Sequence, residues 1–217
     1  QANTSPCEGD IVVGTHSVIH VGAPSSSSVL KISAGTGLTV ETGGTLRVHP
    51  GCELVIQAGG EVTLSGGRLV LEGDAQLRIE HNGRLELQDG SEWLVQDEAG
   101  LVDVHGPVSI PDHQEAQWMA FGSVNWHASS RLWLGSQSTL LCHGNDTGFW
   151  DVTGPVAWHG PGHVLLESLK ASWLNDGHLH ANCRMTVEEC EFIAENLACP
   201  SLFTEGRIRL VHSKVGG

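Results

Sequence analysis

The chain has 217 residues, of which 28 are glycine and 11 are lysine or arginine, and its formal net charge is −14 at pH 7. This acidic balance argues against a nucleic-acid partner, because contact with phosphates requires a basic surface. No apolar run approaches the roughly 18–20 residues that a membrane-spanning helix needs, so membrane insertion is not expected. The length suits one well-buried domain or one extended array of repeats, and residues 1–217 are interpreted as a single domain.

The chain begins with the polar run QANTSP, and residues 1–10 are expected to form an N-terminal tail of the kind that leader cleavage leaves behind. Six cysteines follow no zinc-binding spacing. They are Cys7, Cys52, Cys142, Cys183, Cys190 and Cys199. Two interpretations stay open, oxidised pairs in a secreted protein and buried free thiols, and the composition favours at least one disulfide.

Residues 11–110 repeat one short unit, an apolar residue, a polar residue and another apolar residue followed by a turn. The leading apolar residues recur in steps of eight or seven at Leu38, Leu46, Leu54, Val62, Leu69, Leu77, Leu85, Trp93, Leu101 and Val108. Residues i and i+2 of a strand point to one face, so each unit predicts a short strand with one apolar side. Glycine and asparagine in the turns supply the positive φ angles that tight corners require.

Such strands can bury their apolar faces in antiparallel hairpins or in a parallel coil that winds one way. The nearly constant step favours the coil, because three sides of eight residues give a repeat of about 23–24 residues. Stacking every third unit predicts three outward columns. They are Thr39, Thr63 and Glu86; Arg47, Val70 and Leu94; and Val55, Arg78 and Val102. The same stacking places His81 above or below His105.

The spacing of the repeat becomes less regular in the second half of the chain. Residues 111–122 are expected to form a loop or irregular insertion, and residues 123–217 less regular coils rich in tryptophan and cysteine. MTVEECEFIAEN, at residues 185–196, resembles the common rung of the right-handed parallel β-helix superfamily, which has the pectate-lyase-like fold. GTLRVHPG, at residues 44–51, is similar to the regular rungs of haemagglutinin-like adhesin passengers. The resemblance implies an all-β, right-handed, three-sided solenoid.

Enzymes of this superfamily usually act on acidic polysaccharides, so the alternative functions are a carbohydrate-binding module and a polysaccharide lyase or hydrolase. A lyase needs a basic residue beside a carboxylate, and an inverting hydrolase needs several acids on adjacent rungs. The candidate bases are Lys170, Arg131 and Arg184, and the candidate acids are Asp146, Asp151 and Asp176. The interpretation of these aspartates as ordinary turn residues is the preferred one. Because the family's enzymatic motifs are missing, no catalytic residue is assigned and the chain is not expected to be an enzyme.

Six of the seven tryptophans lie between residues 118 and 173, where they can fill the core or grip sugar rings. Trp126 and Trp158 are expected to face inward because each shares a strand face with a valine. Trp133 lies between two leucines that are expected to face the core, so it should face outward. Trp133 and Trp150 are therefore the predicted carbohydrate-binding residues.

His178 and His180 share one strand face, with Cys183 three residues on, which suggests either a metal half-site or two solvated histidines. The second interpretation is the more common one, so neither a metal ion nor a cofactor is expected.

Together these features predict a secreted or cell-surface module of bacterial type, structural or adhesin-like, and part of a longer exported protein. Its expected partner is a glycan or another surface protein. The sequence leaves the oligomeric state and the disulfide pairing open.

Overall fold

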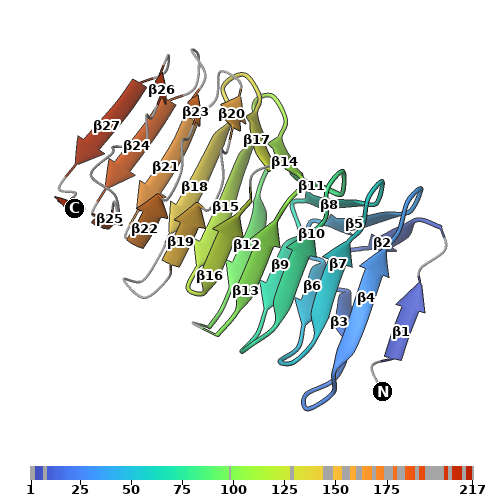
Figure 1. Ribbon diagram of the computed structural model, residues 1–217. Helices are drawn as coiled ribbons and strands as arrows, with labels where there is room; N and C mark the ends of the chain where they lie inside the picture. The colour runs from blue at the N-terminus through green and yellow to red at the C-terminus, as the bar shows by residue number, and fades with distance from the viewer. Residues whose placement is uncertain are drawn as a thin grey trace.

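The computed structural model describes residues 3–6, 9–97, 99–127, 130–143, 149–152, 157–159, 163–167, 170–173, 178–179, 184–188, 191–193, 203–204, 207–211 and 214–216. Side chains are described for residues 9–97, 99–119, 121–122, 124–127, 130–142 and 163–165. In these ranges the chain forms three parallel sheets, of ten, nine and nine strands, with no helix. Figure 1 shows the strands stacked in rows, with the N- and C-termini at opposite ends of the stack.

Each sheet takes every third strand of the chain. Sheet A contains β1 (Asn3–Pro6), β4 (Ser28–Ile32), β7 (Glu53–Ile56), β10 (Gln76–Ile79), β13 (Leu101–Val104), β16 (Ser123–Trp126), β19 (Phe149–Val152), β22 (Lys170–Trp173), β25 (Glu191–Ile193) and β28 (Lys214–Gly216). Sheet B contains β2 (Ile11–Val13), β5 (Gly37–Glu41), β8 (Glu61–Ser65), β11 (Arg84–Leu87), β14 (Pro107–Ile110), β17 (Arg131–Leu134), β20 (Ala157–His159), β23 (His178–Leu179) and β26 (Phe203–Thr204). Sheet C contains β3 (Val18–Val21), β6 (Thr45–Val48), β9 (Arg68–Leu71), β12 (Ser91–Val95), β15 (Glu115–Ala120), β18 (Thr139–His143), β21 (His163–Glu167), β24 (Arg184–Glu188) and β27 (Arg207–Val211).

The predicted three-sided parallel solenoid is confirmed by the strand order and the register. Leu38 pairs with Val62 and Val62 with Leu85, so every coil adds one strand to each sheet. The antiparallel alternative is wrong, because all paired strands run in the same direction. Parallel connections of this kind are right-handed with few exceptions, because the twist of the strands favours that hand.

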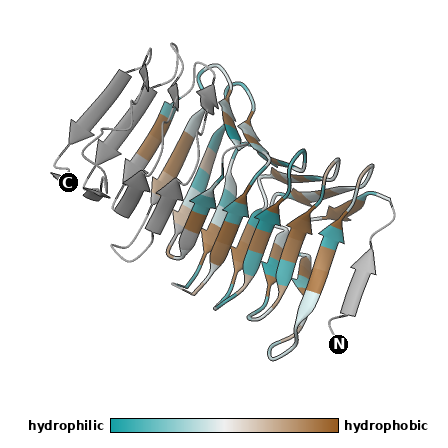
Figure 2. Cartoon of the chain, in the orientation of Figure 1, coloured by the Kyte–Doolittle hydropathy of each residue, from teal (hydrophilic) through white to brown (hydrophobic). Residues whose placement is uncertain are grey.

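One continuous hydrophobic core fills the space between the three sheets. Alternate residues of each strand face it: Leu46 and Val48 are fully buried, whereas Arg47 between them is partly exposed. Figure 2 shows the result, with hydrophobic and hydrophilic stretches side by side in the described strands. The expected columns Thr39, Thr63 and Glu86, and Arg47, Val70 and Leu94, are also in register.

Paired glycines make the sharp corners between sheets. Gly59 has a φ of +78°, in the left-handed region that glycine tolerates best. At Gly60 a Cβ atom would lie only 2.2 Å from the carbonyl oxygen of Ile32 in the preceding coil. Gly60 N–H donates to Gln57 O within the corner, and Gln57 N–H donates to Ile32 O between coils. The corner therefore fixes the chain direction and the coil spacing together.

Aromatic side chains replace aliphatic ones in the middle of the core. Trp93 and Trp118 stack with ring centroids 4.1 Å apart and ring planes 6° apart, and Trp126 tilts against Trp118. All three side chains are fully buried, which confirms the inward position expected for Trp126. The side chain of Trp158 lies outside the described part of the chain.

Two predicted boundaries differ from the structure. The segment 111–122, expected to be a loop or insertion, contains strand β15, which pairs with β12 and β18. Its core residues are Ala116 and Trp118, and this small and aromatic pair hides the aliphatic alternation by which the other strands are recognised. The expected tail 1–10 contains β1, which pairs with β4 although its sequence is polar.

The third expected outward column, Val55, Arg78 and Val102, is wrong at its last residue. Arg78 pairs with Asp103, and Val102 faces the core in register with Leu77. Leu101, expected inside, is only partly buried. The core residues Trp93 and Val102 are nine positions apart, one more than the eight-residue step, so every side chain of β13 faces the side opposite to the expected one.

Cys52 is a buried free thiol whose Sγ donates a hydrogen bond to Ser26 O at 3.2 Å. Cys142 is also fully buried. The expected disulfide falls on the other four cysteines, which lie outside the described residues, so it stays a prediction.

Candidate functional site

Trp133 projects from the outer face of sheet B. Its neighbours Leu132 and Leu134 are fully buried, whereas 54% of Trp133 is exposed, so the outward position predicted for this ring is confirmed. Arg131, two residues earlier on the same face of β17, is exposed as well. An indole ring thus lies on a flat sheet face beside a guanidinium group.

Polar side chains lie next to this ring on the same sheet. Ser109 is in register with Trp133; it is 6% exposed, and its Oγ has no hydrogen-bond partner among the described atoms. One strand further, Glu86 accepts hydrogen bonds from Gln88 Nε2 at 2.8 Å and from Arg84 Nη2 at 3.3 Å. An apolar ring with a guanidinium group on its own strand, a hydroxyl group on the next strand and a carboxylate two strands away has chemistry suited to a sugar ring.

Trp150 does not join Trp133 on this face. It lies on β19 in sheet A, where its register partners are Val124 and Ala171, whereas Trp133 belongs to sheet B. Its side chain lies outside the described residues, so its predicted role in sugar binding stays untested.

A hydrogen-bonded chain of two histidines and a glutamate lies at one end of sheet C. His20 Nδ1 is 2.8 Å from His49 Nε2, and His49 Nδ1 is 2.9 Å from Glu72 Oε2. Arg47 pairs with the other carboxylate oxygen of Glu72. When neutral His49 donates Nδ1–H to Glu72, its Nε2 accepts from His20 Nδ1–H, and the exposed Nε2 of His20 carries a free lone pair.

A second histidine pair follows the ends of β13 and β16. The rings of His105 and His127 stack with centroids 3.8 Å apart, and His127 Nε2 lies 3.3 Å from Asp103 Oδ1. Asn125 Nδ2 donates to the same oxygen at 3.0 Å. Burial lowers the pKa of His105, and the adjacent His127 lowers it further. The expected pairing of His81 with His105 is wrong, because Val104 is in register with Ile79 and the next residue, His105, is therefore aligned with Glu80.

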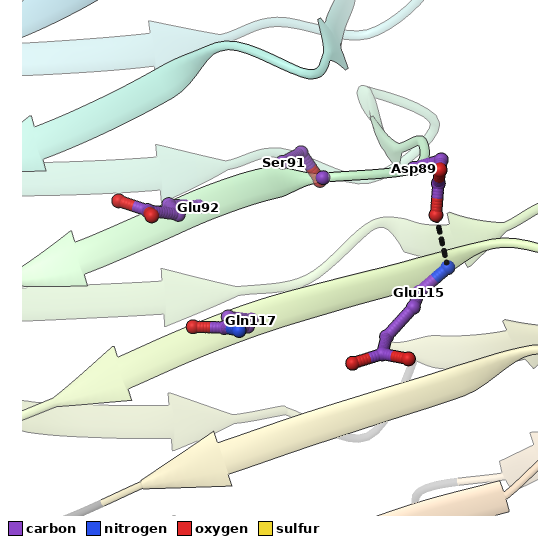
Figure 3. Close-up of a pocket in the computed structure, with 6 residues that line it drawn as sticks. Asp89, Ser91, Glu92, Glu115 and Gln117 are labelled. Carbon is purple, nitrogen blue, oxygen red and sulfur yellow. Dashed lines mark hydrogen bonds between the residues drawn. The ribbon is translucent and has the colours of Figure 1, made fainter.

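An acidic pocket opens between β12 and β15 on sheet C. Its cavity volume is about 310 Å³, and its lining includes Asp89, Ser91, Glu92, Glu115 and Gln117. Figure 3 shows Glu92 and Gln117 on neighbouring strands, with Asp89 accepting a hydrogen bond from Glu115 N–H at 3.2 Å. Three carboxylates therefore gather around one hollow.

Sequence reasoning missed these three clusters because each depends on which residues share a position in successive coils. Val48 pairs with Leu71, and this register puts the next residues, His49 and Glu72, side by side. A search of the sequence for polar residues separated by one coil length would have found His49 and Glu72.

The candidate catalytic and metal-binding residues gain no structural support. The side chains of Lys170, Arg184, Asp146, Asp151 and Asp176 lie outside the described part, as do those of His178, His180 and Cys183. Among the described side chains, no group of three or more histidine, cysteine, aspartate or glutamate residues is arranged to hold a metal ion. Within the same part of the chain there is no helix long and apolar enough to cross a membrane.

Comparison with known proteins names no family for this chain. No family model matches it, and no curated protein matches it. Among solved structures, a TibC-catalysed, hyper-glycosylated fragment of TibA aligns over 99% of this chain and 88% of its own, with 14% identity and a TM-score of 0.24. The strand register is what defines the chain as a three-sided parallel β-solenoid.

Proposed function

We propose that this chain is a structural, adhesin-like module of a secreted or cell-surface protein, which holds binding surfaces on a stiff rod. The observation that supports this most is the unbroken parallel register of the three sheets from β1 to β28. Because each coil is hydrogen-bonded to the next through strands of all three sheets, the rod resists bending and presents flat faces at fixed spacing.

The dimensions agree with a short rigid segment of a longer stalk. Strands in a sheet are about 4.8 Å apart, so a sheet of nine strands extends about 40 Å along the axis. Each sheet contributes one layer of side chains to the core. Leu54, Leu77 and Leu85 belong to this core and are buried by residues of neighbouring coils. A rod of this kind extends by adding coils, without a change in cross-section.

The proposal is tested by measuring both the adhesion and the shape of the chain. Beads coated with the chain are expected to adhere to at least one surface in a panel of glycan- and protein-coated slides, and small-angle scattering should give an elongated particle. The variant Leu54→Asp puts a charge in the core, so it should lose the elongated shape and the adhesion together. Adhesion to none of the surfaces would contradict the adhesin role, and a spherical particle would contradict the rod. Turnover of a uronic-acid polymer would support the enzyme alternative instead.

A second candidate function, carbohydrate binding on sheet B, is supported by the exposure of Trp133. Titration with a panel of neutral and amino-sugar oligosaccharides should change tryptophan fluorescence, and Trp133→Ala should abolish that change. Val12→Ala is the matched control, because Val12 is 60% exposed on the same sheet and far from the indole ring. Equal loss in both variants, or no change in the parent chain, would remove this candidate.

A further inference from the structure

The outer face of sheet C carries an apolar band that the core does not use. Its members face away from the core because each sits next to buried residues of its own strand, as Leu94 does between Trp93 and Val95. We call them the sheet C band: Val70, Leu94, Met119, Leu141 and Leu165. Val70 is covered by its neighbours at 5% exposure, and the other four are partly exposed.

The acidic pocket adjoins this band directly. Glu92 lies two residues before Leu94 on the same face of β12, and Gln117 two residues before Met119 on β15. Gln117 is also in register with Leu141 on the next strand. Leu94 and Met119 thus lie further along their strands than Glu92 and Gln117. Leu141 and Leu165 instead continue the register position of Glu92 and Gln117 across the next two strands, so the acidic pocket has apolar residues of the band on two sides.

The pocket holds more negative charge than its surroundings neutralise. Of its three carboxylates, Glu92 pairs with Arg68, whose Nε is 2.6 Å from Glu92 Oε2. Asp89 accepts only backbone N–H, from Glu115. Among the described residues no cation pairs with Asp89 or Glu115. A positive group entering the pocket would meet two carboxylates that lack a cationic partner.

We propose that the sheet C band and the acidic pocket are a docking surface for a polypeptide segment that presents arginine or lysine beside apolar side chains. The basic head would enter the pocket, where carboxylates form charge-assisted hydrogen bonds with it, and its aliphatic stem would lie along the apolar residues. The band crosses β12, β15, β18 and β21, about 14 Å at 4.8 Å per strand, which exceeds the reach of a small amine. Met119 at its centre can adapt to different apolar partners.

Peptide binding to the full 217-residue chain tests this surface. The probes are three capped peptides of equal length, one alternating arginine and leucine, one arginine and serine, and one glutamate and leucine. The arginine–leucine peptide should bind and shift the methyl NMR signal of Met119, one of two methionines in the chain. The arginine–serine peptide should bind at least tenfold more weakly, and the glutamate–leucine peptide should leave the signal unchanged. Equal binding of both arginine peptides would overturn the proposal, because charge alone would then explain it.

Two isosteric variants distinguish the effect of a pocket carboxylate from the effect of the chain's overall negative charge. Glu115→Gln removes an exposed carboxylate of the pocket and should weaken the arginine–leucine peptide about three- to tenfold. Glu41→Gln removes an exposed carboxylate on sheet B, and affinity should stay within twofold. Equal weakening in both variants would overturn the proposal. A concentration-dependent dimer that buries Met119 would also overturn the proposal, because the occupant would then be a second copy of the chain. A shift of the Met119 signal with anionic lipid vesicles would overturn it as well, because the occupant would then be a membrane. Trp133 lies on a different sheet, so failure here leaves the sugar-binding candidate untouched.

Discussion

Two corner glycines that look alike in the sequence are expected to tolerate substitution very differently. A Cβ at Gly60 would lie 2.2 Å from Ile32 O, whereas the nearest atom to a Cβ at Gly14 is Glu41 Oε2 at 3.6 Å. Gly60→Ala must push two coils apart and should lower the free energy of unfolding by about 1–3 kcal/mol. Gly14→Ala should leave it unchanged or raise it by up to about 1 kcal/mol, because alanine restricts the unfolded chain. Denaturant unfolding measures both, and equal losses would show that coil spacing does not depend on the corner.

The stacked pair His105 and His127 makes stability depend on pH. Because the pKa of His105 is lowered in the folded chain, the unfolded chain binds more protons near this pKa. The stabilising contribution is present above the unfolded value of 6.5 and is lost as the pH falls through the lower folded value. The free energy of unfolding should therefore fall as the pH drops below about 6.5. His105→Gln should flatten this slope, and His81→Gln, an exposed histidine outside the pair, should not. An unchanged slope in His105→Gln would contradict the assignment.

Within the strands, the stacked tryptophans are the core side chains whose removal is expected to lower the free energy of unfolding most. Trp118 on β15 packs between Trp93 and Trp126 and is fully buried. Trp118→Ala should lower the free energy of unfolding by about 3–5 kcal/mol through lost contacts and the cavity that remains. Trp133→Ala, at a ring that is 54% exposed, should change it by about 0.5 kcal/mol or less. Guanidinium unfolding with circular dichroism compares the two, and a large loss at Trp133 would show that its ring is structural.

The sequence predicts the strands well and their edges less well, for a physical reason. Evenly spaced pairs such as Leu46 and Val48 report burial directly, because each residue alternates between the core and the surface. Strand β15 is not recognisable in the sequence because Ala116 and Trp118 break the aliphatic pattern. The inward and outward residues of β13 are exchanged in the prediction, because the step before this strand is one residue longer than eight. Trp133 could be placed because two buried leucines flank it. His20 and His49 could not be paired, because their contact joins different coils.

Over the whole molecule, a solenoid stabilised by nearest-neighbour contacts should respond to mutations by distance along the axis. Leu54 and Leu77 are register partners on adjacent strands, and Leu132 lies on a strand three coils further along, about 14 Å away. Each single change to alanine should lower the free energy of unfolding by about 2–5 kcal/mol. Leu54→Ala with Leu77→Ala should depart from additivity by about 0.5 kcal/mol or more, because the two cavities merge, whereas Leu54→Ala with Leu132→Ala should add within about 0.5 kcal/mol. Double-mutant cycles from equilibrium unfolding measure both terms. Equal coupling at both distances would show that the rod unfolds through contacts longer in range than one coil, and the modular stalk would lose its physical basis.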